Sequence, residues 1–134
     1  MKQLHAALAA AALAAPPAQA EGEIIKVRIM SSDLAATIAQ GAVHTCREKG
    51  YQAAAVVLDR AGNMIAAQRD TLASRHTLEI AERKAGLVVM SGVDSGAGSL
   101  VGAVGVSGAP GGDIDAECAR GGIDKVRDIL DFAD

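Results

Sequence analysis

One stretch near the end of the chain constrains the fold more than any other. Residues 101–126 read VGAVGVSGAPGGDIDAECARGGIDKV, and the first six of them form an apolar run typical of a buried strand. Residues 107–112 contain three glycines and a proline, so they cannot continue regular structure. Asp113 is a good N-cap, and apolar residues then recur at helical spacing. The stretch therefore predicts a strand, a glycine-rich turn and a C-terminal helix.

The composition sets the size and the chemistry of the core. The chain has 134 residues, half of them hydrophobic, which is enough for one domain. With one Tyr, one Phe and no Trp, the core must be aliphatic, and platforms for stacking bases are absent. The formal net charge is -3 and no basic cluster stands out, which argues against a nucleic-acid partner.

The N-terminal residues 1–20 have the pattern of a secretory signal peptide. Lys2 supplies the positive end, and residues 4–15 form an apolar segment too short to span a bilayer. Residues 18–20 read Ala-Gln-Ala, a typical cleavage site. We therefore expect a periplasmic or secreted protein whose single domain is residues 21–134, with no membrane span after cleavage.

Periodicity and turn residues define the first half of the domain. A helix is predicted from the Ser-Ser-Asp start signal at residues 31–33 to a stop at Gly50. Its apolar positions fall on one face; they are residues 34, 35, 38, 39, 42 and 46. Two short strands, residues 53–58 and 64–69, flank a segment rich in turn formers and predict a hairpin.

A second helix and a further strand are predicted before the final strand. The helix spans residues 75–85, with Ser74 as its N-cap and Gly86 as its stop, and residues 87–90 have the character of a strand. The resulting order is α-β-β-α-β-β-α. It predicts a single α+β domain in which helices pack on an antiparallel sheet.

The second helix holds the densest polar chemistry of the chain. His76, Glu79 and Arg83 share one face of this helix, and Glu82 is nearby. A histidine with one or two carboxylates can bind a transition metal, so His76, Glu79 and Glu82 are candidate metal ligands. The alternative is a solvated face with a Glu79–Arg83 ion pair, which the residues alone favour. His44 is expected to be a surface histidine.

The glycine-rich turn allows two interpretations. Gly108, Gly111 and Gly112 leave backbone NH groups free ahead of a helix, where carboxylate or phosphate can bind. Asp113 and Asp115 already bring negative charge to this place, so a purely structural turn is favoured. The turn matches neither a dinucleotide-binding nor a Walker sequence.

The same motifs resemble the GlcG/HbpS-like heme-binding family, also described as a heme-degrading domain and found in the C-terminal half of PduO-type proteins. That family closes with a glycine-rich strand, a VSGAPGG-like turn, an acidic pair and a helix, as do residues 102–126 here. The VVLDRAGN hairpin, residues 56–63, is similar to a family hairpin. RHTLEIAERKA, residues 75–85, is similar to the family's H-T-x-x-x-A-x-x-K-A segment.

The resemblance implies where a heme would bind. In the family the helix with the H-T motif borders the heme site, so His76 becomes the candidate iron ligand. Basic residues of this helix and NH groups of the turn are candidates to meet the propionates, and side chains from the hairpin, the helix and the last strand would form an apolar slot. The expected cofactor-binding residues are His76, Arg75, Arg83, Lys84, Gly108, Gly111 and Gly112. The expected slot consists of Val56, Leu58, Leu78 and Val104.

The same resemblance implies that the two cysteines of the chain lie close enough to bond to each other. Cys46 and Cys118 are the only cysteines, an even number in an exported chain. The resemblance implies that the first and last helices pack together on the sheet and that the protein assembles into higher homo-oligomers. We therefore predict a Cys46–Cys118 disulfide, with two buried free thiols as the alternative.

One departure from the family pattern bears on function. Most relatives carry a further segment between the K-A motif and the final strands, whereas this chain passes from Ala85 to Val101 almost directly. The resemblance implies a protein that binds heme or iron for carriage, storage or sensing, and the signal-peptide pattern predicts that it is exported. The alternatives are a heme-degrading enzyme, for which no catalytic residue is assigned, and a partner-binding module that has lost the heme site.

Overall fold

The computed structural model describes residues 27–91 and 100–132. As predicted, the domain is α+β, and its elements in chain order are α1 (Ser32–Glu48), β1 (Ala54–Asp59), β2 (Met64–Arg69), α2 (His76–Ser91), β3 (Gly102–Ser107), α3 (Gly112–Asp124) and α4 (Arg127–Asp131). The single C-terminal helix expected from the sequence is therefore divided into α3 and α4. The predicted signal sequence, residues 1–20, lies outside the described residues. Within the described part, none of the helices combines the length and apolarity needed to cross a membrane.

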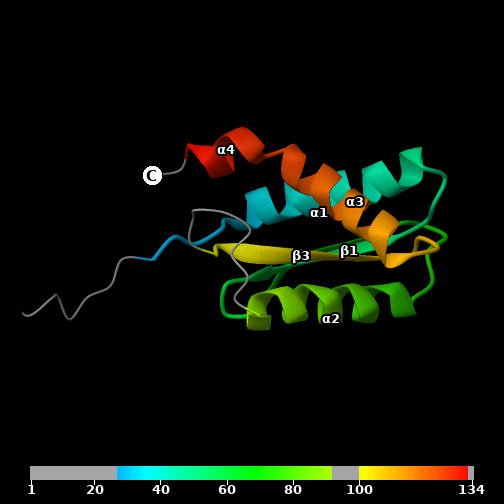
Figure 1. The fold of residues 1–134 in the computed structure, drawn as a ribbon, viewed down its shortest axis with the longest axis horizontal. Coiled ribbons are helices and arrows are strands. Elements are labelled where there is room, and N and C mark those ends of the chain that lie inside the picture. The colour runs from blue at the N-terminus through cyan, green and yellow to red at the C-terminus, as the bar shows by residue number, and fades with distance from the viewer. Residues whose placement is uncertain (1–26, 92–99, 133–134) are drawn as a thin grey trace, which may run out of the picture.

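The sheet has three antiparallel strands with β1 in the middle, in the order β2-β1-β3. Val57 of β1 pairs with Ala66 on one side and with Val104 on the other. Figure 1 shows α2 alone on one face of the sheet, and α1 with α3 on the opposite face. Since helices cover both faces, the first five residues of β1 are apolar and buried, and only Asp59 at its end is polar.

Alternate residues of β1 therefore enter two separate cores. Ala55 and Val57 pack with the α1 side, whereas Val56 and Leu58 pack with α2. The helix α2 lies close to the sheet because small residues meet there, Gly105 of β3 against Ala81 and Ala85 of α2. A Cβ atom at Gly105 would lie 2.6 Å from Ala85 N, so only glycine allows β3 to approach α2 this closely.

The other layer is held by a disulfide between α1 and α3. Cys46 and Cys118 are bonded, with Cα atoms 5.2 Å apart and both residues fully buried. The helices approach closely, since a Cβ atom at Gly122 would lie 2.9 Å from Ala42 N. The prediction of a disulfide is confirmed, and α1 pairs with α3, the first part of the predicted C-terminal helix.

Local capping signals define several boundaries as predicted. Ser31 Oγ accepts a hydrogen bond of 3.2 Å from Leu34 N at the start of α1. Gly50 adopts a left-handed φ of 86° just after this helix, which suits a residue without a Cβ atom. The hairpin strands occur at residues 54–59 and 64–69, within one residue of the prediction.

Two boundary predictions were wrong. The strand predicted at residues 87–90 is the last turn of α2, which runs through Gly86 to Ser91. A short apolar run fits a buried strand and a helix equally well, and a single glycine does not end a helix that is supported by packing. The N-cap of α3 is Gly111, not Asp113, which lies within the first turn.

Candidate functional site: a groove between α2 and α3

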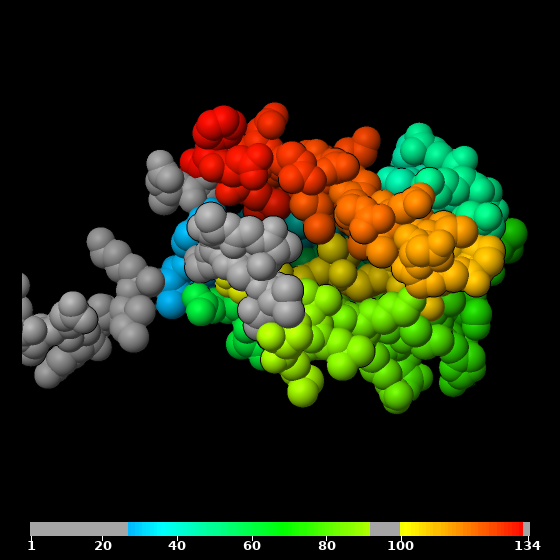
Figure 2. All heavy atoms as spheres, viewed as in Figure 1, coloured from blue at the N-terminus to red at the C-terminus, as the bar shows by residue number. Residues whose placement is uncertain are grey.

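A hollow follows β3 between α2 and α3, and we call it the α2–α3 groove. Its volume is about 480 Å³. In Figure 2 the yellow strand β3 lies at the bottom of a hollow bordered by α2 in green and α3 in orange. It is lined by Lys84, Val88 and Ser91 of α2, residues 102–106 of β3 with Leu100 before it, and Gly112, Asp115, Ala116, Ala119, Arg120 and Ile123 of α3.

The groove follows from the sheet topology. Among the described strands β3 is an edge strand, with β1 as its neighbour on one side. Since α2 and α3 lie on opposite faces of the sheet, the space beyond the open edge lies between them (Figure 1). Small residues keep this space open: Ala103 and Gly105 on the strand, and Ala116 and Ala119 on the helix.

An ion pair joins the two walls of the groove. Lys84 Nζ lies 2.6 Å from Asp115 Oδ2, and Asp115 Oδ1 accepts a hydrogen bond of 3.0 Å from Ala109 N. The Asp115 carboxylate is thus shared by α2, the glycine-rich turn and α3, and the residue is only 6% exposed. Arg120 is exposed and forms no ion pair with a described residue.

The glycine-rich turn is built around this carboxylate. Gly108 has a φ of 140°, and a Cβ atom there would lie 2.6 Å from Ala53 Cα, so the turn requires glycine for both reasons. The NH group of Ala109 already binds Asp115. The NH groups of Gly108, Gly111 and Gly112 were candidates to bind an anion, but of these residues only Gly112 lines the groove. This geometry favours the structural interpretation of the turn.

The predicted ligands on α2 separate into two groups. Lys84 lies in the groove, whereas Arg75, His76 and Arg83 are exposed and are not among its lining residues. Arg83 Nη2 lies 2.7 Å from Glu79 Oε1, with side chains 77% and 59% exposed, so this face carries the ion pair expected for a solvated helix.

The candidate metal ligands are not brought together as a set. Among residues 27–91 and 100–132, no three His, Cys, Asp or Glu side chains are grouped to hold a metal ion, and this range includes His76, Glu79 and Glu82. His44 is a surface residue as predicted. Its Nδ1 atom lies 3.5 Å from Glu48 Oε1.

Three of the four side chains expected to form an apolar slot lie outside the groove. Val56 and Leu58 are buried in the packing of α2 on the sheet, with Leu78 beside them. Only Val104 of the four expected residues lines the groove. Four further lining residues carried no sequence signal for a site: Val88, Ala119, Arg120 and Ile123. The helical spacing of Ala119 and Ile123 marked an apolar face of α3, but nothing in the sequence placed that face opposite α2.

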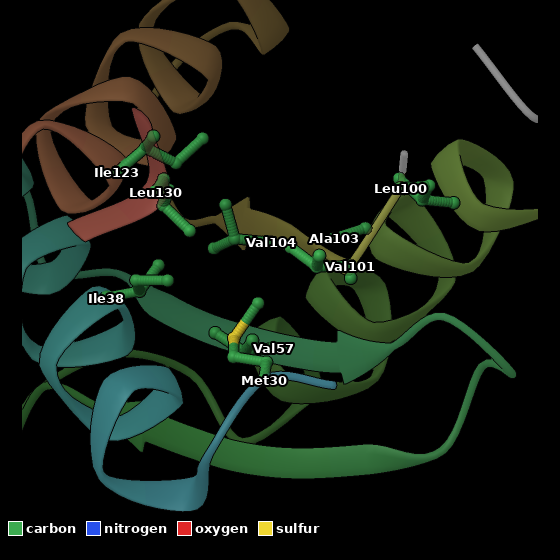
Figure 3. A pocket seen from close by; sticks show the side chains of 10 residues that line it. Met30, Ile38, Val57, Leu100, Val101, Ala103, Val104, Ile123 and Leu130 are labelled. Atoms are coloured by element: carbon green, nitrogen blue, oxygen red, sulfur yellow. The ribbon is translucent and has the colours of Figure 1, made fainter. Parts of the chain in front are cut away.

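A second, smaller hollow adjoins the groove. Its volume is about 180 Å³, and it lies between the start of α1, the sheet and the C-terminal helices. Figure 3 shows apolar side chains around it, among them Ile38, Val57 and Leu130. Val104 and Ile123 line both hollows, so the groove continues into an apolar interior.

Comparison with known proteins identifies the family. A family model described as haem degrading protein HbpS-like matches residues 30–97. The chain therefore belongs to the HbpS-like family, and the resemblance noted in the sequence is confirmed. No curated protein matches the chain.

Solved structures show the same fold. A double mutant of HbpS from Streptomyces reticuli is 25% identical with a TM-score of 0.68, covering 84% of this chain and 97% of that one. Protein ORFY of Klebsiella pneumoniae, of the family DUF336, is 20% identical with a TM-score of 0.66, covering 77% and 94%. PduOC, solved as a heme complex, is 17% identical with a TM-score of 0.62, covering 72% and 94%.

Proposed function

We propose that this protein binds heme, and that the α2–α3 groove is the binding site. The observation that carries the proposal is the combination of an apolar hollow of about 480 Å³ with two cationic side chains, Lys84 and Arg120. Small-molecule sites are typically concave, largely apolar and roughly 300–1,000 Å³ in volume, with a few polar groups that fix orientation. Heme has a flat apolar ring and two carboxylates, which match these features.

The residues present fit the porphyrin. Val88, Val104 and Ile123 come from three different elements and offer apolar contacts to a flat ring. The guanidinium of Arg120 can bind a propionate through two parallel hydrogen bonds. Bound heme would supply the one-electron and oxygen chemistry of its iron.

Asp115 positions the second cation. Its buried carboxylate holds the Lys84 ammonium at 2.6 Å, so Lys84 stays on the α2 wall instead of extending into solvent. The groove keeps a net positive charge because Lys84 and Arg120 together outweigh Asp115. These two cations can pair with the two carboxylates of a dianionic ligand.

We further propose that the protein is exported to the periplasm or secreted after removal of residues 1–20. The disulfide supports this, because disulfides persist in oxidising compartments. We also propose homo-oligomers, since α2 exposes Ile80, Leu87 and Met90 by 44%, 66% and 83%. The carriage, storage or sensing of heme or iron would follow from reversible binding.

Heme breakdown is the second candidate function, favoured by the description of the matching family as haem degrading. The two functions differ in the fate of the ligand. Incubating the heme-loaded protein with a reductant and oxygen would release iron and bleach the Soret band if the protein degrades heme. A carrier would keep the band.

A hemin titration of residues 21–134 tests the proposed site. We expect a new Soret band, and about tenfold weaker binding in Arg120→Ala, because a hydrogen bond to a charged group contributes about 1.5–3 kcal/mol. Arg60→Ala is the matched control, since Arg60 is exposed in the hairpin turn outside the groove. Binding that is unaffected by Arg120→Ala would contradict the groove as the site, and the absence of any Soret change would favour a partner-binding module.

A further inference from the structure

The α2–α3 groove lacks the side chains that hold heme iron in proteins. Heme iron is bound by His, Cys, Met or Tyr, and none of these is among the described residues that line the groove. Residues 92–99, with the sequence GVDSGAGS, contain none of them either. The groove therefore offers contacts to the ring and to its carboxylates, but no strong ligand to a metal at the ring centre.

The other candidate iron ligands are either engaged with protein partners or lie outside the groove. Both carboxylate oxygens of Asp115 have partners, Lys84 and Ala109 N. The two cysteines are bonded to each other. Met30 lies in the adjoining apolar hollow, where it is buried and lies against Gly102. His76 is exposed and is not a lining residue of the groove.

We infer that the groove recognises the porphyrin itself, a flat amphipathic dicarboxylate, and that the central iron adds no bond to the protein. This inference rests on the proposed heme-binding function. It follows from the chemistry of the lining: Val88, Val104 and Ile123 would contact the ring, while Lys84 and Arg120 would contact the propionates. All these contacts are the same for a porphyrin with or without a metal. The ligand class is therefore porphyrin dicarboxylates, whatever occupies their centre.

The test compares hemin with iron-free protoporphyrin on residues 21–134. We expect the two dissociation constants to agree within about threefold, and protoporphyrin to displace hemin at matching concentrations. Arg120→Ala should weaken both ligands by the same factor, while Arg60→Ala should weaken neither. His76→Ala and Met30→Leu should leave the Soret maximum of the hemin complex unchanged.

The outcomes separate the inference from the function on which it rests. Hemin binding more than about tenfold tighter than protoporphyrin would overturn the inference while leaving heme binding intact. A Soret shift in His76→Ala or in Met30→Leu would overturn it too, and would name the iron ligand. If neither hemin nor protoporphyrin binds, the proposed function fails and the inference fails with it.

Discussion

The Lys84 ammonium lies 2.6 Å from the Asp115 carboxylate and so joins α2 to α3 across the groove. These helices cover opposite faces of the sheet. Asp115 also accepts a hydrogen bond from the NH group of Ala109, in the turn between β3 and α3. A single carboxylate thus fixes the turn and the two walls of the proposed site.

We predict that Asp115→Ala lowers the free energy of unfolding by about 2 kcal/mol, because it removes two hydrogen bonds of a buried charged group. Urea unfolding followed by far-ultraviolet circular dichroism measures this, since the chain has no Trp to serve as a fluorescent probe. Asp113→Ala is the matched control, because Asp113 is an exposed acid in the first turn of the same helix. Equal losses in the two variants would contradict the role of Asp115.

The disulfide should contribute a large share of the stability of the protein. Cys46 and Cys118 are separated by 72 positions, and closing a loop of this length contributes about 4 kcal/mol in the chain-entropy model. We expect the double variant Cys46→Ala, Cys118→Ala to unfold at a clearly lower urea concentration. Thiol counting under denaturing, non-reducing conditions provides the independent check, and two free thiols in exported protein would contradict the bond.

Local chemistry explains why much of the fold was predictable. The caps at Ser31 and Gly50 and the turn formers between the hairpin strands act within a few residues, so the sequence alone carries their signal. The strand prediction at residues 87–90 was wrong because a short apolar run fits both a strand and a helix. In the structure Leu87 and Met90 are exposed, and Val89 packs against the core between α2 and the sheet.

The groove was not predictable because its parts are distant in sequence. Lys84 and Asp115 are separated by 31 positions, and only the packing of α2 and α3 on opposite faces of the sheet brings them together. Lys84 was among the expected residues because of the family resemblance. Arg120 was not, because an exposed arginine on a helix carries no sign of its neighbours. The Cys46–Cys118 bond was predicted only because the resemblance placed two helices side by side.

Asp70 should make the protein sensitive to acid. Two hydrogen bonds of 2.9 Å join it to Arg47, and these bonds are the main cause that lowers the pKa of Asp70 below its ordinary value. A carboxylate with a lowered folded-state pKa stabilises the protein above its unfolded pKa of about 4, and that stability is lost as the pH falls through the folded-state value.

We therefore predict that the stability difference between the parent and Asp70→Asn is large at pH 7 and shrinks as the pH falls from about 4 to 2. Urea unfolding at several pH values measures it. Glu82→Gln is the control, because Glu82 is exposed and has no ion pair with a described residue. A difference that stays constant over this range would show that the ionised Asp70 carboxylate contributes no stability.

Substitution of a glycine by alanine should change the stability of the protein in opposite directions at two positions, Gly105 of β3 and Gly86 of α2. At Gly105 of β3 an added Cβ atom would clash with the backbone of α2, including Ala85 N at 2.6 Å. Gly105→Ala should therefore push α2 away from the sheet, widen the groove, and cost about 1–3 kcal/mol of stability. At Gly86 of α2 an added Cβ atom meets nothing within 4 Å. Gly86→Ala should stabilise the protein by about 0.5–1 kcal/mol, because alanine favours a helix interior.

Thermal unfolding of both variants measures these changes, and the Gly86 variant also tests the course of α2 through residues 87–90. If Gly86 ended the helix, as the sequence pattern predicted, alanine at this position would gain nothing from helix propensity. It would also disfavour the left-handed backbone conformation in which glycine commonly ends a helix. A destabilised Gly86→Ala would thus contradict the continuous helix. Hemin titration of Gly105→Ala adds a functional readout, since a displaced α2 would separate Lys84 and Val88 from β3 and weaken binding.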